Sequence, residues 1–326
     1  MTHLERLLLT LAIIFCSLAA GWSLRRLGDT GIRALSPARI DHLRHWLQTV
    51  AIFILIPLSA MLSLWGLPQP EPGLLALPLL GLASYICGGL LALLAARLLK
   101  LDRPQTGSFF CCGTFTNIGA VGGLVCLLFL GENSIALVAL YRLLEEIYYF
   151  SIAFPIARWF GPDNRNQRLN FRAFRPGGML IAIVCALLLG IALNLLGIYR
   201  PAPCSPIASA SLLTATIFFL FAIGLTLRIS RVWGYIPQSL TMCAIKFAGL
   251  PLVIIPLAAL AGYGTYESGL PLRTAAILCS MPVAMTALVP PAMFRLDVDL
   301  ANSCWIVTTC GLVLALPLLM LALPYL

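Results

Sequence analysis

Cys111-Cys-Gly-Thr-Phe-Thr-Asn-Ile-Gly-Ala-Val-Gly-Gly123 is an apolar stretch interrupted by glycines and by the polar pair Thr116 and Asn117. A second stretch, Ser280-Met-Pro-Val-Ala-Met-Thr-Ala-Leu-Val-Pro-Pro291, is interrupted by prolines. Glycine and proline break the helical hydrogen-bond ladder, so we expect two discontinuous helices whose freed backbone groups and half-helix dipoles form a polar site. The alternative is close helix packing at the glycines and tolerated kinks at the prolines. Finding one such stretch in each half of the chain favours the site.

The composition predicts a membrane protein. Of the 326 residues, 60% are hydrophobic and 10% are charged, and the mean hydropathy is +0.97. A soluble domain carries roughly 25% charged residues. The apolar blocks here are about 20 residues long, enough to cross a hydrocarbon core as helices. Lipid offers the backbone no hydrogen-bond partners, so only helices and closed barrels can span it. The net charge of +9 lies in short loops and indicates membrane topology, not nucleic-acid binding.

The apolar blocks predict ten transmembrane helices in one all-α membrane domain, with no segment long enough for a separate soluble domain. The first block is similar to a signal peptide, but Arg25 and Arg26 follow it, whereas a signal peptide carries its positive charge in front. We therefore expect it to stay as a span. The spans are expected at Glu5–Leu24, Arg44–Trp65, Leu74–Leu98, Ser108–Leu130, Ser134–Trp159, Gly178–Leu196, Ile207–Leu227, Tyr235–Ala261, Leu272–Phe294 and Ala301–Leu323.

The distribution of basic residues predicts the orientation. Sixteen Lys and Arg residues lie in the loops after odd-numbered spans, and three lie on the opposite side. Basic loops stay in the cytoplasm, so we expect both termini outside, in a plasma or inner membrane.

Ten spans divide into two sets of five, expected at 1–160 and 178–326 and joined by a cytoplasmic linker at 161–177. An odd number of spans in each half gives the halves opposite orientations, as in inverted repeats. An offset of 165 residues places Phe53 on Phe218 and Asn117 on Pro282. Spans 4 and 9 then correspond as the two broken helices.

Several short motifs, taken in order, resemble the auxin efflux carrier family of permeases and, through it, the bile acid–sodium symporter superfamily. In bacterial members span 4 typically carries Asn-x-Gly-aromatic-x-Gly-x-Pro. Here Ala120 replaces the aromatic residue and Leu124 replaces the proline. The matching positions over the chain are Asn117, Gly119, Gly122, Phe129-Leu-Gly131, Leu140-Tyr141, Lys246 with Pro251, Met281-Pro282, Thr309 and Leu316-Pro-Leu318.

The resemblance implies a scaffold of spans 1, 2, 6 and 7 and a transport domain of spans 3–5 and 8–10. Spans 4 and 9 would cross near the midplane. It also implies transport of small organic anions. The expected binding residues are Thr116, Asn117, Gly119, Met281 and Pro282.

Four ionisable residues fall inside the apolar spans: Arg142, Glu145, Glu146 and Lys246. At 1.5 Å per residue, Glu146 lies about 18 Å into its span and Lys246 about 15 Å. Charges at that depth are costly and usually functional, although an internal ion-pair cluster is the structural alternative. We expect Lys246 to pair with a glutamate. Its other possible role is as counter-charge to a substrate carboxylate.

Other candidate positions point to structure and not to chemistry. His42 and His45 are spaced for a metal but lack a third ligand and lie at a basic membrane edge. Asp297 and Asp299 are better placed to cap the last span than to bind a cation. Of the eleven cysteines, only Cys204 lies in a loop, which predicts packing residues and no disulfide framework. We expect no metal and no cofactor.

Three classes of function compete: a transporter, an intramembrane enzyme and a channel. A channel is disfavoured because no ring of filter residues is visible in the sequence. The leading one is a secondary transporter, with a small organic anion, the lipid bilayer and a proton or sodium ion as its partners. A sodium-coupled bile-acid-type symporter or an ion antiporter is the rival in the same class. An intramembrane enzyme is disfavoured, because the sequence contains no HExxH or GxGD motif and no serine placed with a histidine partner. The substrate, the direction of transport and the oligomeric state, including a homodimer, are left open.

The charge count predicts a testable topology. In a cysteine-free background, a single cysteine replacing Gly73 should react with a membrane-impermeant thiol reagent added outside cells. A single cysteine replacing Asn166 should react only after the membrane is opened. The opposite pattern would overturn the model with ten spans and an external N-terminus.

Overall fold

The computed structural model describes residues 2–29, 37–66, 72–162, 178–226 and 232–326. The described residues are helical and contain no strand; a single isolated bridge pairs Thr116 with Val283. Six of the described helices are long and apolar enough to cross a membrane, which confirms an all-α membrane protein. They are Leu4–Gly28, Ala38–Trp65, Leu77–Leu98, Cys204–Gly224, Val232–Leu260 and Val298–Tyr325.

These six helices coincide with predicted spans 1, 2, 3, 7, 8 and 10. Predicted span 6 corresponds to the shorter α10 (Gly178–Leu195). The other three predicted spans are interrupted. Span 4 consists of α5 (Arg103–Thr114), η4 (Ile118–Gly122) and α6 (Gly123–Leu130). Span 5 consists of α7 (Asn133–Tyr141), α8 (Glu145–Tyr148), η5 (Tyr149–Ala153) and α9 (Phe154–Trp159). Span 9 consists of α14 (Leu270–Cys279), η11 (Met285–Leu288) and α15 (Val289–Met293). The break in span 5 differs from the continuous helix we expected. From residue 163 on, the predicted linker lies outside the described residues.

The chain forms two compact units. The first consists of Met1–Glu71, Gly119–Ala139 and Pro176–Leu227. The second consists of Pro72–Ile118, Leu140–Arg175 and Arg228–Leu326. The first unit holds predicted spans 1, 2, 6 and 7, the set that the family resemblance assigns to a scaffold. It also holds residues 119–139, which that resemblance assigns to the other group, because α6 packs against helices of the first unit.

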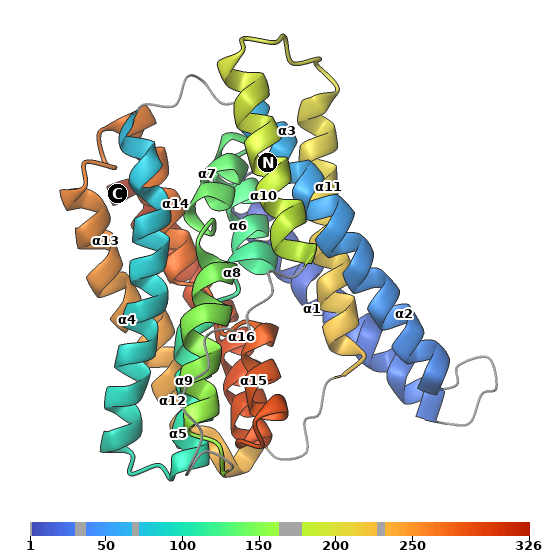
Figure 1. The fold of residues 1–326 in the computed structure, drawn as a ribbon, viewed down its shortest axis with the longest axis vertical. Coiled ribbons are helices and arrows are strands. Elements are labelled where there is room, and N and C mark those ends of the chain that lie inside the picture. Colours follow the sequence, from blue (N-terminus) through green and yellow to red (C-terminus); the bar gives the residue numbers. More distant parts are fainter. Residues whose placement is uncertain (1, 30–36, 67–71, 163–177, 227–231) are drawn as a thin grey trace. The chain divides into compact units, whose positions relative to one another are not determined.

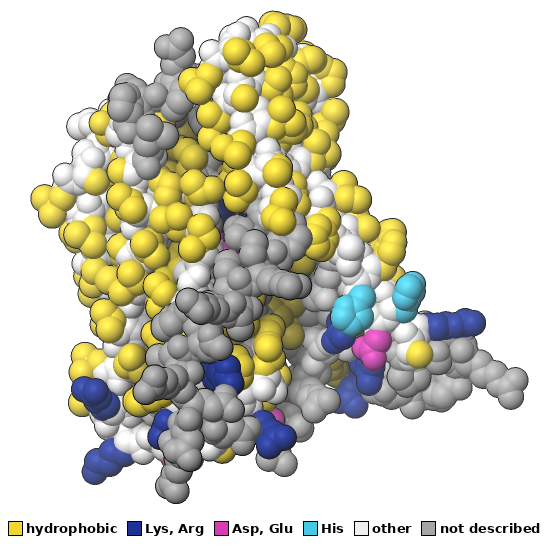
Figure 2. Space-filling model, viewed as in Figure 1, with side chains coloured by type: hydrophobic (Ala, Val, Ile, Leu, Met, Phe, Trp, Pro, Cys, Tyr) yellow, Lys and Arg dark blue, Asp and Glu magenta, His cyan; other side chains and the backbone are white. Residues whose placement is uncertain are grey.

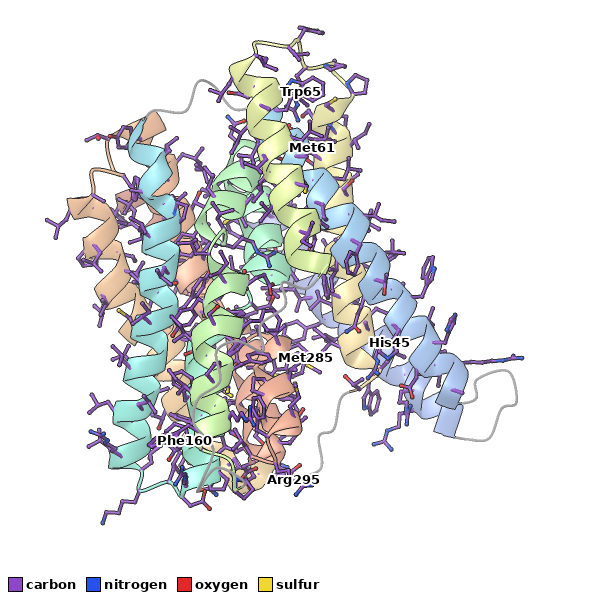
Figure 3. The ribbon with its side chains drawn as sticks, viewed as in Figure 1. His45, Met61, Trp65, Phe160, Met285 and Arg295 are labelled. Carbon is purple, nitrogen blue, oxygen red and sulfur yellow. The ribbon has the colours of Figure 1, made fainter. Side chains whose placement is uncertain are left out.

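In the first unit, α11 (Cys204–Gly224) packs against α1 (His3–Asp29) and α3 (Ile56–Trp65), and α10 packs against α3 (Figure 1). Met61 and Trp65 both lie on α3 (Figure 3). Glycines allow these contacts to be close. A Cβ on Gly21 would collide with the Phe221 carbonyl, and a Cβ on Gly190 would stand 2.6 Å from the Met61 carbonyl oxygen. Small residues at such contacts let helix backbones approach in a membrane, where van der Waals packing drives association.

Polar contacts tie the loops of the first unit together. Arg200 donates to Glu132 over 2.7 Å, and the Ser205 hydroxyl also donates to Glu132. The Trp65 indole donates to the Ile198 carbonyl oxygen at 2.9 Å. The bonds to Glu132 hold the loop and the start of α11 against the turn between α6 and α7, and the Trp65 bond holds the loop against the end of α3.

In the second unit, α4 (Leu77–Leu98) packs against α5 and α13 (Leu250–Leu260). Helix α13 also packs against α14, and α12 (Ile236–Ala244) packs against α16 (Val298–Ala322). The outward side of α4 carries exposed Leu79, Ile86, Leu90 and Leu94. Hydrophobic side chains cover much of the face of this unit seen in Figure 2, as expected of a surface in contact with lipid.

Three of the four π-helical turns among the described residues end two residues before a proline, and η4 is the exception. The three turns are η2 (Ala51–Leu55) before Pro57, η5 before Pro155 and η9 (Ile245–Gly249) before Pro251. A proline ring clashes with the carbonyl four residues earlier, and that carbonyl falls within the π-helical turn in all three cases. The wider turn accommodates the proline and allows the helix to continue.

Close contact between Gly88 and Gly113 holds α4 against α5, because a Cβ on either glycine would collide with the carbonyl of the other. We expect Gly88→Val to destabilise the protein by about 1–3 kcal/mol, the usual cost of overpacking. The measurement is the midpoint of thermal unfolding in detergent. Gly234→Ala is the control, since nothing lies within 4 Å of the added Cβ. Equal midpoints for the Gly88 variant and the wild type would contradict the close contact.

Candidate functional site

The breaks in spans 4 and 9 meet at a short crossing, which lies in the second unit and is formed by residues 115–117 and 282–284. The Asn117 amide donates to the Pro282 carbonyl oxygen at 2.9 Å, and the Ala284 amide donates to the Phe115 carbonyl oxygen at 3.0 Å. Thr116 and Val283 are the central pair of this antiparallel bridge. Each extended segment thus supplies hydrogen bonds that the other has lost by leaving its helix.

Local sequence explains why the chain is extended here. Pro282 has no N–H and cannot continue the ladder of α14, which ends at Cys279. Thr116 and Val283 are β-branched and suit extended backbone. Span 4 has no equivalent proline, yet α5 ends at Thr114 and Phe115 is extended. The replacement of the family's proline by Leu124 therefore does not prevent a break in span 4.

Hydroxyl groups from neighbouring helices satisfy the remaining amides of the crossing. The Thr116 amide donates to the Tyr149 hydroxyl at 3.4 Å, and the Tyr149 ring packs on Phe115 with centroids 3.9 Å apart. The Val283 amide donates to the Thr308 hydroxyl at 3.2 Å. One break is thus supported from η5 and the other from α16.

Lys246 is the charged residue of the crossing. It lies in η9 and its side chain is fully buried. Its Nζ donates to the Gly113 carbonyl oxygen at 2.6 Å, to the Thr116 hydroxyl at 2.7 Å and to the Phe115 carbonyl oxygen at 3.4 Å. The carbonyls at a helix C-terminus lack partners within the helix and carry partial negative charge, so a cation is favourable there.

The predicted ion pair between Lys246 and a glutamate is wrong. No Asp or Glu among the described residues forms an ion pair with Lys246. Arg142 Nε instead donates to Glu145 Oε2 at 2.8 Å, across the turn that separates α7 from α8. The i, i+3 spacing of Arg142 and Glu145 allows this pair on a continuous helix, and the pair also forms here, where a turn interrupts span 5.

The ion pair is connected to the crossing through Tyr149. The Glu145 carboxylate is buried and lies beside the Tyr149 hydroxyl, which accepts from Thr116. A phenol can accept and donate at the same time. Glu146 is half-buried in α8, next to the ion pair. The four membrane charges therefore form two groups, Lys246 at the crossing and Arg142 with Glu145 behind Tyr149.

The structure brings together most of the residues predicted as a binding site. Thr116, Asn117, Met281 and Pro282 are buried at or next to the crossing. Gly119 lies in η4, two residues past the crossing. Met285, labelled in Figure 3, begins the half-helix that follows the second break. Binding by these residues stays a prediction.

The sequence does not identify Tyr149 and Thr308 as residues of the site. Both support the crossing, but tyrosine and threonine are common in apolar spans and neither has a distinctive spacing here. The adjacent pair Tyr148-Tyr149 beside two glutamates was the available signal. Asp297 behaves as predicted: its carboxylate caps α16 by accepting from the Leu300 amide at 2.9 Å.

No known protein-family model matches this chain, and a comparison with curated proteins finds no significant match either. The function is therefore inferred from the crossing and the charges around it.

The contacts of Lys246 predict a particular pattern of stability. Lys246→Met should destabilise the protein by about 1–3 kcal/mol, because it leaves buried oxygen acceptors without a donor. Adding Glu146→Gln should not restore the loss, since Glu146 is not its partner and the two effects should be additive. Thermal unfolding of both single variants and the double variant measures this. A double variant as stable as the wild type would re-establish the Lys246–Glu146 pair.

Proposed function

We propose that this protein is a secondary transporter, a permease of the auxin efflux carrier type, that moves small organic anions across the membrane by alternating access. The observation that carries the proposal is the crossing of two broken helices beside a buried lysine that pairs with no carboxylate of the described residues. Broken helices that meet within a membrane are where transporters bind substrates and ions.

The charge of Lys246 favours an anion. An ammonium without a counter-ion in a low-dielectric interior produces a positive potential that weakens slowly with distance. Its three N–H groups are directed at three protein oxygens, so the lysine acts through its field and not by direct contact with the substrate. We assign the direct contact to Asn117, because the NH2 group of an amide side chain is a donor that a carboxylate can accept from.

The spacing of the broken helices supports an inverted repeat. Leu270, which begins α14, lies 167 residues after Arg103, which begins α5, and Met285 lies 167 residues after Ile118 in the same way. Pro104 and Pro271 occupy the second position of the two helices. This offset is two residues larger than the 165 expected from sequence. It supports ten spans arranged as two five-helix repeats. In this proposal the termini lie outside, because the basic residues lie in the loops after odd-numbered spans.

The grouping of the helices suits alternating access, which requires bodies that can move against each other. Predicted spans 1, 2, 6 and 7 belong to one compact unit. The crossing, with Lys246 and the Arg142–Glu145 pair, lies within the other. We propose the first unit as scaffold and the second as the substrate-binding body.

Sodium-coupled symport and ion antiport are the alternatives within this class. Both need convergent oxygen ligands, and Thr116 and the nearby carbonyls are already bonded to Lys246. A dependence of uptake on sodium would favour symport. A proton as coupling ion is compatible with the buried Glu145 and the half-buried Glu146.

A thermal-shift screen of the purified protein against organic acids tests the proposal, because a ligand that binds the folded form raises its apparent stability. Monocarboxylates, dicarboxylates and aromatic acids should be compared with their neutral amides. We expect a subset of the acids to stabilise the protein and to be taken up by proteoliposomes. Stabilisation by the amides as strong as by the acids would contradict an anion site.

Asn117→Ala should keep its fold and lose binding and uptake of the identified acid by about 10-fold or more, the loss of one hydrogen bond to a charged group. Asn133→Ala is the matched control, since Asn133 is an exposed amide at the start of α7. Binding and uptake are measured by thermal shift and in proteoliposomes. Wild-type uptake by the Asn117 variant would remove this residue from the site.

A further inference from the structure

The oxygens around Lys246 have the character of ligands for a small cation. Two are backbone carbonyls, of Gly113 and Phe115, from the last turn of α5 and the residue that follows it. The third is the Thr116 hydroxyl, from the extended backbone of the break. Unwound carbonyls and the C-terminal ends of half-helices are the groups with which transporters coordinate sodium ions.

An ammonium and a sodium ion make similar demands on such a site. Both carry one positive charge, and a lysine ammonium is a compact, strongly hydrated point charge. Here the site is buried, lies at the negative end of α5, and receives no charge from any Asp or Glu of the described chain. A single cation satisfies it and a vacancy would leave three buried acceptors unpaired.

We propose that Lys246 fills a sodium-type cation site at the crossing with its own ammonium, so that the protein carries a tethered cation where it would otherwise bind Na⁺. The ion is then supplied by the chain and is present throughout the cycle. The broken end of α5 keeps its shape without an ion from solution.

The consequence for transport rests on the proposed function, whereas the cation site does not. If the crossing binds an organic anion, the tethered charge supplies the favourable field that a co-transported Na⁺ would otherwise supply. The wild-type carrier should then work equally well in sodium and in choline salts.

Removing the tethered cation tests the proposal without any substrate. Lys246→Ala deletes the ammonium and its chain but leaves the three oxygens and the space beside them. Its thermal unfolding is measured at 0 to 300 mM NaCl, and choline chloride is added to keep the ionic strength constant. The Debye length, below about 10 Å, then also stays constant. We expect the unfolding midpoint of Lys246→Ala to rise with Na⁺ concentration, as for any ligand bound to the folded state.

Two matched variants separate a specific site from a general salt effect. Lys246→Met keeps most of the side-chain volume without the charge, so it should be destabilised and should not respond to Na⁺. Thr116→Val combined with Lys246→Ala removes one of the three oxygens and should weaken the response several-fold. The wild type should show no sodium-specific shift.

Several results would overturn the inference. One is a sodium-specific shift in the wild type as large as in Lys246→Ala, and another is a folded Lys246→Ala that ignores Na⁺. Lys246→Ser is the second variant, because its hydroxyl offers a further oxygen ligand. If both small variants are unfolded in sodium as well as in choline salt, the proposal also fails, because bound Na⁺ should replace the lost contacts. A negative substrate screen with a positive sodium response would reject the proposed function and keep the cation site.

Discussion

Inside a membrane, every backbone amide and carbonyl must find its partner within the protein. Helices meet this requirement by themselves, and a broken helix does not. In this protein the two breaks are tolerated because the antiparallel bridge, the Tyr149 and Thr308 hydroxyls and the Lys246 ammonium supply the missing partners. Each of these side chains lies where it can pair with a backbone group or hydroxyl of the crossing.

Packing of the second unit makes this arrangement possible. Gly88 and Gly113 let α4 and α5 touch through their backbones. The π-helical turn η9 precedes Pro251 and carries Lys246. Pro251, which would disrupt a regular helix, thus follows the π-helical turn that carries Lys246. Glycine, proline and lysine, each unfavourable in an apolar helix, become compatible when they are combined at one place.

The charges have separate roles once their partners are known. Arg142 and Glu145 neutralise each other, whereas Lys246 is balanced by carbonyl dipoles and a hydroxyl, which carry no net charge. The region of the crossing therefore keeps a positive charge in a low-dielectric setting. Such a region stabilises an anion and disfavours a second cation. This asymmetry connects the local geometry to the transport of organic anions proposed above.

The sequence by itself determined the class of the protein and the location of the breaks in spans 4 and 9. Long apolar blocks permit helices alone, and the interruptions at Thr116-Asn117 and Met281-Pro282 lie where the structure leaves the helix. The tertiary structure decided which groups meet: that Lys246 binds the end of α5 and no glutamate, that span 5 breaks at Arg142, and that Tyr149 and Thr308 complete the crossing. Spacing along one helix predicts neighbours on that helix, but partners on different helices depend on close packing between them, which no periodicity within a single span records.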